Sequence, residues 1–171
     1  MHKTIIVTAA LVCGIGVSIQ AQTNQKNQLT TSLSSNSMET TFNQEQKNVF
    51  STIEKMVAAF QEQDIDGVLA TYEDNAIVMF EPQTPVSGQE MLRKAFTEFA
   101  AIKPQYTFSG HEVYIAGNIA THIAPWTMTG HLPDGSKIEQ SGLSVAVLRK
   151  QPDGTWLMIQ DNPHGQILMN N

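Results

Sequence analysis

Three residues combine acid or base chemistry with positions that favour it. Glu81 precedes Pro82 and follows the apolar stretch 76–80, so a strand would carry its carboxylate to the rim of the core. A carboxylate at the lip of an apolar cavity has a raised pKa and can act as a general base, whereas a loop glutamate would simply be solvated. Asp161 and His164 form a second candidate acid/base pair, although the Asp-Asn-Pro sequence between them is also typical of turns.

A histidine and a tryptophan share one face of a predicted strand. His122 and Trp126 alternate with the small or flexible side chains of Ala120, Ala124 and Met128. Such a face leaves space for a ligand, with the histidine as the polar group of an apolar wall. The alternative is a core histidine bonded to the backbone, beside a tryptophan that fills volume.

Metal and cofactor sites are not indicated. The four histidines beyond the N-terminal segment lack the short spacing of a metal-ligand motif: His111, His122, His131 and His164. The sequence has no phosphate-binding loop, no dinucleotide-binding glycine pattern and no serine nucleophile elbow. We therefore expect neither a metal nor another cofactor.

The charge pattern argues against nucleic acid as a partner. The formal net charge is −6, and the basic residues are scattered, with adjacent pairs only at 93–94 and 149–150. A surface that follows a phosphate backbone needs clustered basic side chains. We expect no nucleic-acid binding.

The first 21 residues have the pattern of a signal peptide. Lys3 gives a basic start, an apolar run follows, and small residues offer a cleavage site after Ala21. The alternative is a retained anchor, but the apolar run is short, and we expect no stable membrane insertion after cleavage. Residues 22–44 are polar and are expected to form a flexible spacer.

The single cysteine is consistent with this export segment. Cys13 lies inside it and follows Val12, where a lipoprotein acylation site would have a small residue. The mature chain then has no cysteine and no disulfide, which fits a bacterial periplasm better than a disulfide-stapled extracellular module. We expect a periplasmic or secreted protein.

Apolar periodicity predicts three helices at the start of a single domain, residues 45–171. The helical spacing runs over 53–60, 65–72 and 92–102. Asp64 is expected to cap the second helix, which would end at Tyr72, and Ser87 and Glu90 are expected to form a capping box for the third. Between these two helices, the spacing predicts a strand at 76–80 and a loop at 82–87.

Four long strands are predicted after the helices, at 106–115, 119–130, 137–150 and 155–161. Ala-Gly-Asn and two Pro-Asp-Gly turns separate them, and short turns of this kind join antiparallel neighbours. Helices followed by an antiparallel meander indicate an α+β fold. Because strands this long must bend to wrap the helices, we expect a curved antiparallel sheet packed against three N-terminal helices, with a cavity between them.

Several short motifs carry a family resemblance through their order and spacing: Ala58-Ala59-Phe60, Asp64-Ile65-Asp66-Gly67, Tyr72, Asp74-Asn75-Ala76, Glu81-Pro82 and Val86-Ser87-Gly88. Over roughly residues 45–166 the chain resembles the nuclear transport factor 2-like superfamily, which includes SnoaL-like and ketosteroid-isomerase-like proteins. The resemblance implies a cone-shaped fold and a homodimer.

The resemblance also bears on chemistry. Ketosteroid isomerases carry a proton-shuttling carboxylate at the position of Glu81, if one extra residue is allowed in the strand. Their donors to the enolate oxygen correspond to Met56 and Ala146, and neither side chain can donate a hydrogen bond. Without such donors several kcal/mol of transition-state stabilisation are lost, so the standard ketosteroid isomerase reaction is not expected.

We therefore expect an apolar pocket that binds a small hydrophobic or aromatic molecule. Its predicted lining residues are Met56, Phe60, Tyr72, Met79, Phe96, Phe99, His122 and Trp126. One alternative is a cofactor-free isomerase, cyclase or dehydratase with Glu81 or the Asp161/His164 pair as general base. Another is a dimerisation or protein-interaction module, because a fold alone does not define a function.

Overall fold

The first helix begins where the predicted spacer ends. The computed structural model describes residues 41–169, so the predicted signal peptide and spacer residues 22–40 lie outside the described residues. Helix α1 (Gln44–Gln61) starts after Asn43, whose side chain accepts a hydrogen bond from the Gln46 backbone. The Gln46 side chain accepts one from the Asn43 backbone in return, both at 3.0 Å. This capping box satisfies two amides that have no partner within the helix.

The second helix is shorter than the sequence indicated. Asp64 caps α2 (Ile65–Leu69) by accepting a hydrogen bond from the Gly67 backbone at 2.9 Å, which confirms the predicted cap. The prediction that Tyr72 ends this helix is wrong, because Tyr72 opens strand β1 (Tyr72–Glu81). Its backbone pairs with Met158, far away in the sequence, and this pairing overrides the helical spacing.

The third helix begins without the predicted capping box. The segment 82–87 is not a loop throughout, since Thr84–Ser87 forms strand β2 and pairs with β1. Ser87 is held in that pairing, and its hydroxyl donates to the Asn75 carbonyl rather than to a helix amide. Gly88, with φ of 89°, is the N-cap of α3 (Gln89–Ala100). No helix among residues 41–169 is both long and apolar enough to cross a membrane.

The strand predicted at 106–115 is two strands. Strands β3 (Gln105–Phe108) and β4 (Glu112–Ala116) both pair with β5 (Ile119–His131), at opposite ends of it. They separate opposite Pro125, whose carbonyl accepts from Ser109 but whose nitrogen has no hydrogen to donate. The proline therefore interrupts the pairing of β5 on the side of β3 and β4. The pairing of β5 with the strand on its other side is not interrupted.

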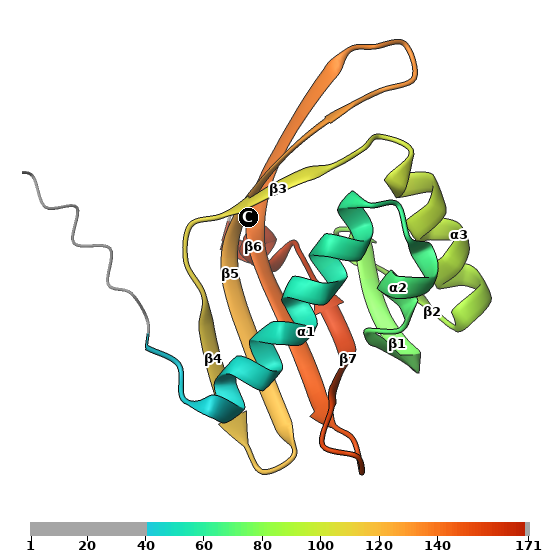
Figure 1. Cartoon of the computed structure of the whole chain (residues 1–171). Coiled ribbons are helices and arrows are strands. Elements are labelled where there is room, and N and C mark those ends of the chain that lie inside the picture. Colours follow the sequence, from blue (N-terminus) through green and yellow to red (C-terminus); the bar gives the residue numbers. More distant parts are fainter. Residues whose placement is uncertain (1–40, 170–171) are drawn as a thin grey trace, which may run out of the picture. The chain divides into compact units, whose positions relative to one another are not determined.

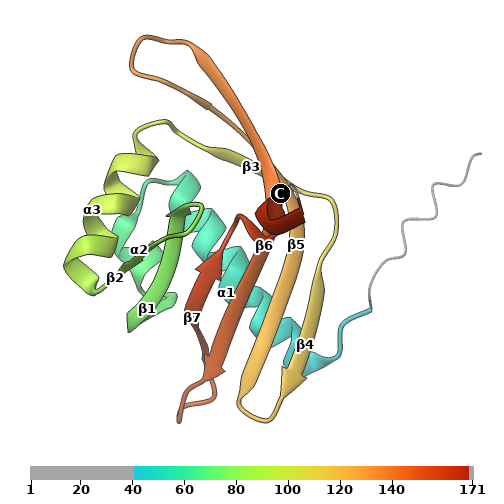
Figure 2. The ribbon, with the colours of Figure 1, turned by 180° about the vertical axis from the view of Figure 1, so that it is seen from behind.

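The seven strands form one curved sheet with the helices on one face (Figures 1 and 2). Strands β6 (Lys137–Lys150) and β7 (Trp156–Asn162) complete the order β2-β1-β7-β6-β5-β3, with β4 beside β5. The expected α+β fold is confirmed. The sheet is not entirely antiparallel, because β1 and β7 run parallel. The described residues end with the 3₁₀-helix η1 (Gly165–Met169), on the face away from α1 (Figure 2).

Glycines complete the two Pro-Asp-Gly turns. Gly135 and Gly154 have φ of 86° and 89°, a left-handed conformation in which a side chain is strained. In each turn the aspartate side chain accepts a hydrogen bond from the backbone two residues later, at Ser136 and Thr155. Both predicted turns are confirmed.

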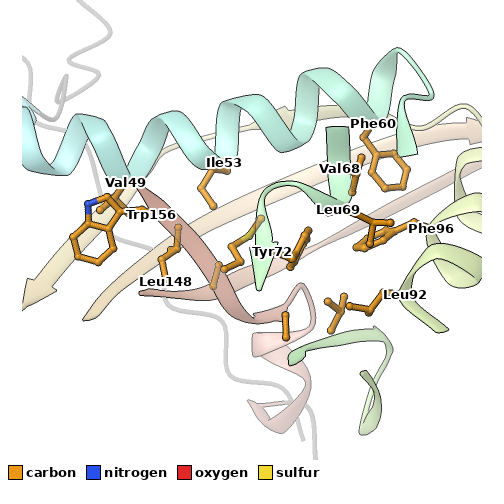
Figure 3. Packing of buried hydrophobic residues seen from close by; sticks show 14 of the residues in the cluster. Val49, Ile53, Phe60, Val68, Leu69, Tyr72, Leu92, Phe96, Leu148 and Trp156 are labelled. Carbon is orange, nitrogen blue, oxygen red and sulfur yellow. The ribbon is translucent and has the colours of Figure 1, made fainter. Parts of the chain in front are cut away.

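The core lies between α1, α2, α3 and the concave face of the sheet (Figure 3). From α1, Val49 and Ile53 point toward Leu148 and Trp156 of the sheet. At the other end of the helix, the core includes Phe60, Val68, Leu69, Tyr72, Leu92 and Phe96. The sheet curves under this second group, and a partly enclosed cavity lies beside it.

Candidate functional site

A cavity of about 90 Å³ lies between α1, α3 and the concave face of the sheet. All of the predicted lining residues except His122 line it: Met56, Phe60, Tyr72, Met79, Phe96, Phe99 and Trp126. Three elements supply its aromatic wall, since the Phe96 ring lies 5.7 Å from the Phe60 ring and 4.9 Å from the Phe80 ring. The wall is apolar, and its rings meet edge to face, a favourable arrangement for aromatic pairs.

A buried carboxyl group forms the polar end of the cavity. The Tyr72 hydroxyl donates a hydrogen bond of 2.8 Å to Asp161 Oδ2, and the two residues are 3% and 9% exposed. Burial raises the pKa of Asp161, against the opposing effects of the Tyr72 hydrogen bond and the nearby His164. Burial and the Asp161 carboxylate also raise the pKa of Tyr72. A carboxyl group in this setting can take up or release a proton closer to neutral pH.

A second tyrosine reaches the same cavity from the edge of the sheet. Tyr106 of β3 lines the cavity, and its ring lies 5.9 Å from the Trp126 ring at a steep angle. Its hydroxyl makes no hydrogen bond to any residue in the described part of the chain. Sequence reasoning missed Tyr106 because the strand containing it was taken as continuous through 115. The available signal was that Tyr106 lies opposite Met128, on a neighbouring strand whose side chains alternate between the two faces of the sheet.

His164 closes the cavity beside Asp161. Its ring Nε2 lies 3.2 Å from the Phe80 carbonyl, and because a carbonyl only accepts, Nε2 carries the hydrogen. The structure brings Asp161 and His164 to one cavity, as the sequence predicted, without a hydrogen bond between them. The His164 backbone also donates to the Asn162 side chain at 3.0 Å, so the alternative, turn chemistry, is present as well.

Glu81 lies outside this cavity. It borders an open hollow next to it, together with Glu98 of α3, and its side chain is exposed. The pairing of β1 with β2 shifts register between Met79 and Glu81. Phe80 lines both spaces, so the strand presents an aromatic ring to the cavity and leaves the carboxylate at the rim.

His122 packs under the first half of α1, away from the cavity. Its Nε2 lies 3.0 Å from His111 Nδ1, and the Phe50 ring lies 4.5 Å from the His111 ring. His122 is 1% exposed, and its Nδ1 has no hydrogen-bond partner among residues 41–169. The prediction that His122 and Trp126 lie on the same face of the strand is confirmed. The strand is long, however, so the two side chains contact different residues. The partner His111 was missed because it was assigned to the middle of a strand.

The described residues contain no group of three or more histidine, cysteine, aspartate or glutamate side chains placed to hold a metal. Near the His111/His122 pair, the Glu54 carboxylate acts on His111 through its charge. Metal binding therefore gains no support from the geometry of residues 41–169.

Residues 53–157 match the family model of the SnoaL-like domain. No curated protein matches the sequence. Among solved structures, the chain is similar to a ketosteroid isomerase-like protein from Erwinia carotovora atroseptica, with 20% identity and a TM-score of 0.61 over 70% of this chain and 95% of that one.

Two further structures have the same fold. One is a nuclear transport factor 2-like superfamily protein from Salmonella enterica, with 13% identity and a TM-score of 0.64 over 72% of this chain and 93% of that one. The other, from Streptomyces avermitilis, is described as a candidate dehydratase of the NTF2-like family, with 14% identity and a TM-score of 0.60 over 68% and 93%. At these identities the similarity is one of fold.

We expect the buried histidine to make stability depend on pH. Burial, followed by the neighbouring His111, lowers the pKa of His122 from 6.5 to about 4. The unfolded chain therefore binds the proton more readily, so this contribution is complete above pH 6.5 and is lost as the pH falls toward 4. A shift of this size corresponds to about 3 kcal/mol.

Urea denaturation at several pH values between 7 and 4 measures this loss. The variant His122→Leu should lose distinctly less stability over the range than the wild type. The control His131→Leu changes an exposed histidine at the end of the same strand and should retain the full loss. An identical pH dependence in all three proteins would contradict the assignment to His122.

Proposed function

Given that the chain belongs to the SnoaL-like domain family, we propose that its partly enclosed cavity binds a small hydrophobic or aromatic molecule. The observation that carries the proposal is the aromatic wall of Phe60, Phe80, Phe96 and Phe99 around a partly enclosed space that also contains a few polar groups. Concave, mostly apolar sites with a few placed polar groups are typical of small-molecule binding.

The volume of the cavity limits the size of the ligand. An engineered apolar cavity of about 150 Å³ holds benzene, and this cavity, at about 90 Å³, is smaller. A single ring enters after small movements of its walls, and the flexible side chains of Met56 and Met79 can make them. A four-ring steroid is much larger than this volume, which agrees with the lack of hydrogen-bond donors at Met56 and Ala146.

Toluene should raise the thermal stability of the full chain in a saturable manner. A ligand at tenfold excess over its Kd stabilises by about 1.4 kcal/mol, which is several degrees for a domain of this size. Ser144→Leu fills the cavity from β6 and should abolish the shift. Ser141→Leu, on an exposed position of the same strand, should preserve it. Equal shifts in both variants would place the binding elsewhere.

A second candidate function is proton transfer without a cofactor. The buried Asp161 favours it, because a carboxyl group with a raised pKa beside an apolar space is suited to general base catalysis. Structures of the same fold are described as a ketosteroid isomerase-like protein and a candidate dehydratase. An isomerase, cyclase or dehydratase reaction would use the same cavity.

Proton transfer can be detected by exchange of the α-hydrogens of cyclohexanone in D₂O, followed by NMR. The rate should rise with pH through the raised pKa of Asp161, since only the ionised group is a base. Asp161→Asn should lower the rate about 10²-fold or more. Glu81→Gln, at the exposed rim, should have little effect. A large loss of rate in Glu81→Gln and little loss in Asp161→Asn would instead identify Glu81 as the base, which is the other alternative that the sequence offers.

We also propose that the protein acts after export, in the periplasm or outside the cell, and as a homodimer. The residue pattern of 1–21 supports export. The outer face of β4, β5 and β6 supports a dimer, because apolar side chains remain partly exposed there: Tyr114 (60% exposed), Ile123, Val145 and Val147.

Light scattering should give the mass of two chains for the wild type. Val147→Asp should give one chain, since a charge on the outer sheet face cannot be buried without a partner. Met91→Asp, on the exposed side of α3, is the control and should remain dimeric. A monomeric wild type would refute the dimer but not the cavity.

A further inference from the structure

A buried histidine nitrogen under α1 has no hydrogen-bond partner. His122 of β5 is 1% exposed, and its Nδ1 has no partner among residues 41–169. Its Nε2 lies 3.0 Å from Nδ1 of His111, which is half-buried in the connection between β3 and β4. The two rings share one hydrogen bond, and the unpartnered Nδ1 determines which ring donates it.

The tautomers of the pair follow from this arrangement. If His111 donated, neutral His122 would carry its hydrogen on Nδ1, as a buried N–H without an acceptor. Buried N–H groups without a partner are rare, because their lost hydration is not replaced. The hydrogen therefore lies on His122 Nε2. His111 accepts it at Nδ1 and carries its own hydrogen on Nε2.

The pair cannot accommodate a further proton in this arrangement. A proton added to His111 would go to Nδ1, which would place two hydrogens between the rings. Moving the His122 hydrogen to Nδ1 would relieve this clash, but it would create the buried N–H without an acceptor. Burial lowers the pKa of both histidines, which acts in the same direction. A protonated His111 is therefore stable only away from His122.

A groove beside His111 offers a place for the charged ring. It has a volume of about 240 Å³ and is lined by Glu54 and Gln61 as well as by apolar side chains of α1. Burial lowers the pKa of His111 and the Glu54 carboxylate raises it, so the carboxylate attracts the charged ring. Gly110 precedes His111, and a Cβ there would meet open space, so the backbone is not packed at this point.

Other carboxylates on the neighbouring strands are engaged elsewhere. On β4, Glu112 is exposed and accepts a hydrogen bond from the Tyr114 hydroxyl at 3.0 Å. On β7, Asp161 lies in the same cross-strand row as His122, but on the far side of β6. Neither carboxylate contributes to the lowered pKa of either histidine. Glu54 of α1 is the charge that His111 would meet on leaving the pair.

His111 also supports the partition between this groove and the cavity. Val57 of α1 and Phe108 of β3 line both spaces. The His111 ring contacts Phe50 and Phe108, with ring distances of 4.5 Å and 5.2 Å. When His111 leaves, Phe108 loses a neighbour and can move into the space that the ring occupied.

We propose that His111 is an acid-operated latch: its protonation releases it from His122 toward Glu54, and the movement of Phe108 that follows opens a side entrance from the groove to the cavity. Such an entrance serves any ligand of the cavity, so it goes beyond the proposed function. A released histidine has its ordinary pKa of 6.5, whereas burial lowers the pKa in the closed state, so acid favours the open state. Below pH 6.5 the ratio of open to closed molecules should rise by up to about tenfold per pH unit, until His111 is protonated in the closed state as well.

Quenching of Trp126 fluorescence by acrylamide measures access to the cavity, because the Trp126 ring lines it. The chain has two tryptophans, so the signal of the Trp126→Phe variant, which retains Trp156, is subtracted. The quenching constant of Trp126 should be about twofold or more larger at pH 5.5 than at pH 7.5. That of the buried Trp156 should not change, which distinguishes the opening from global unfolding. Equal Trp126 constants at the two pH values would overturn the proposal.

Variants test the latch without a change of pH. At pH 7.5, His111→Ala should show the high Trp126 quenching of the open state. His111→Phe keeps a ring in place without a titrating group and should show low quenching at both pH values. Glu54→Gln should weaken the response to acid, whereas Glu62→Gln, which removes the same charge from an exposed position at the end of α1, should preserve it. Equal quenching in His111→Ala and His111→Phe at pH 7.5 would refute the latch.

Nitrogen-15 NMR of the wild type at pH 7.5 checks the tautomers directly. Nδ1 of both His111 and His122 should lack a hydrogen, and a hydrogen on His122 Nδ1 would refute the assignment on which the latch depends. A failed latch leaves the proposed function intact, because stabilisation by toluene is measured at neutral pH in the closed state.

Discussion

The last strand of the chain lies in the middle of the sheet, and the site depends on this placement. Strand β7 inserts between β1 and β6, parallel to the first and antiparallel to the second. It sets Asp161 opposite Val78 and within 2.8 Å of the Tyr72 hydroxyl, across 89 residues of sequence. Neither the sheet nor the polar end of the cavity is complete until these final residues are in place. Pairings so distant in sequence are costly in loop-closure entropy and form slowly.

Helix α1 covers two buried polar sites of different character. Over its first half, Phe50 packs against the His111/His122 pair, of which His122 is buried and His111 half-buried, and both pKa values are lowered. Over its second half, Met56 and Phe60 roof the cavity that contains Asp161. Burial favours the neutral form of both the histidine and the aspartate. The neutral histidine has lost its proton, whereas the neutral aspartate has kept its proton. Burial under the apolar face of α1 thus lowers the pKa of the histidine and raises the pKa of the aspartate.

The C-terminal segment closes the cavity where β7 ends. The Trp126 ring nitrogen donates to the Pro163 carbonyl at 3.0 Å, and Pro163 and His164 both line the cavity. At this crossing, a Cβ at Gly142 would lie 2.6 Å from the Pro163 carbonyl oxygen. The glycine at this position therefore permits the close crossing. The residues that follow β7 therefore also form part of the cavity wall.

Local signals in the sequence determined the helical faces, the cap at Asp64, the two Pro-Asp-Gly turns and the alternating faces of β5, because each depends on residues a few positions apart. Only the tertiary structure decided that Tyr72 opens a strand, that His122 meets His111 rather than a ligand cavity, and that Asp161 is enclosed while Glu81 stays at the rim. Each of these depends on a partner distant in sequence. Local spacing shows that a side chain faces inward, but the pairing of remote strands determines what it faces.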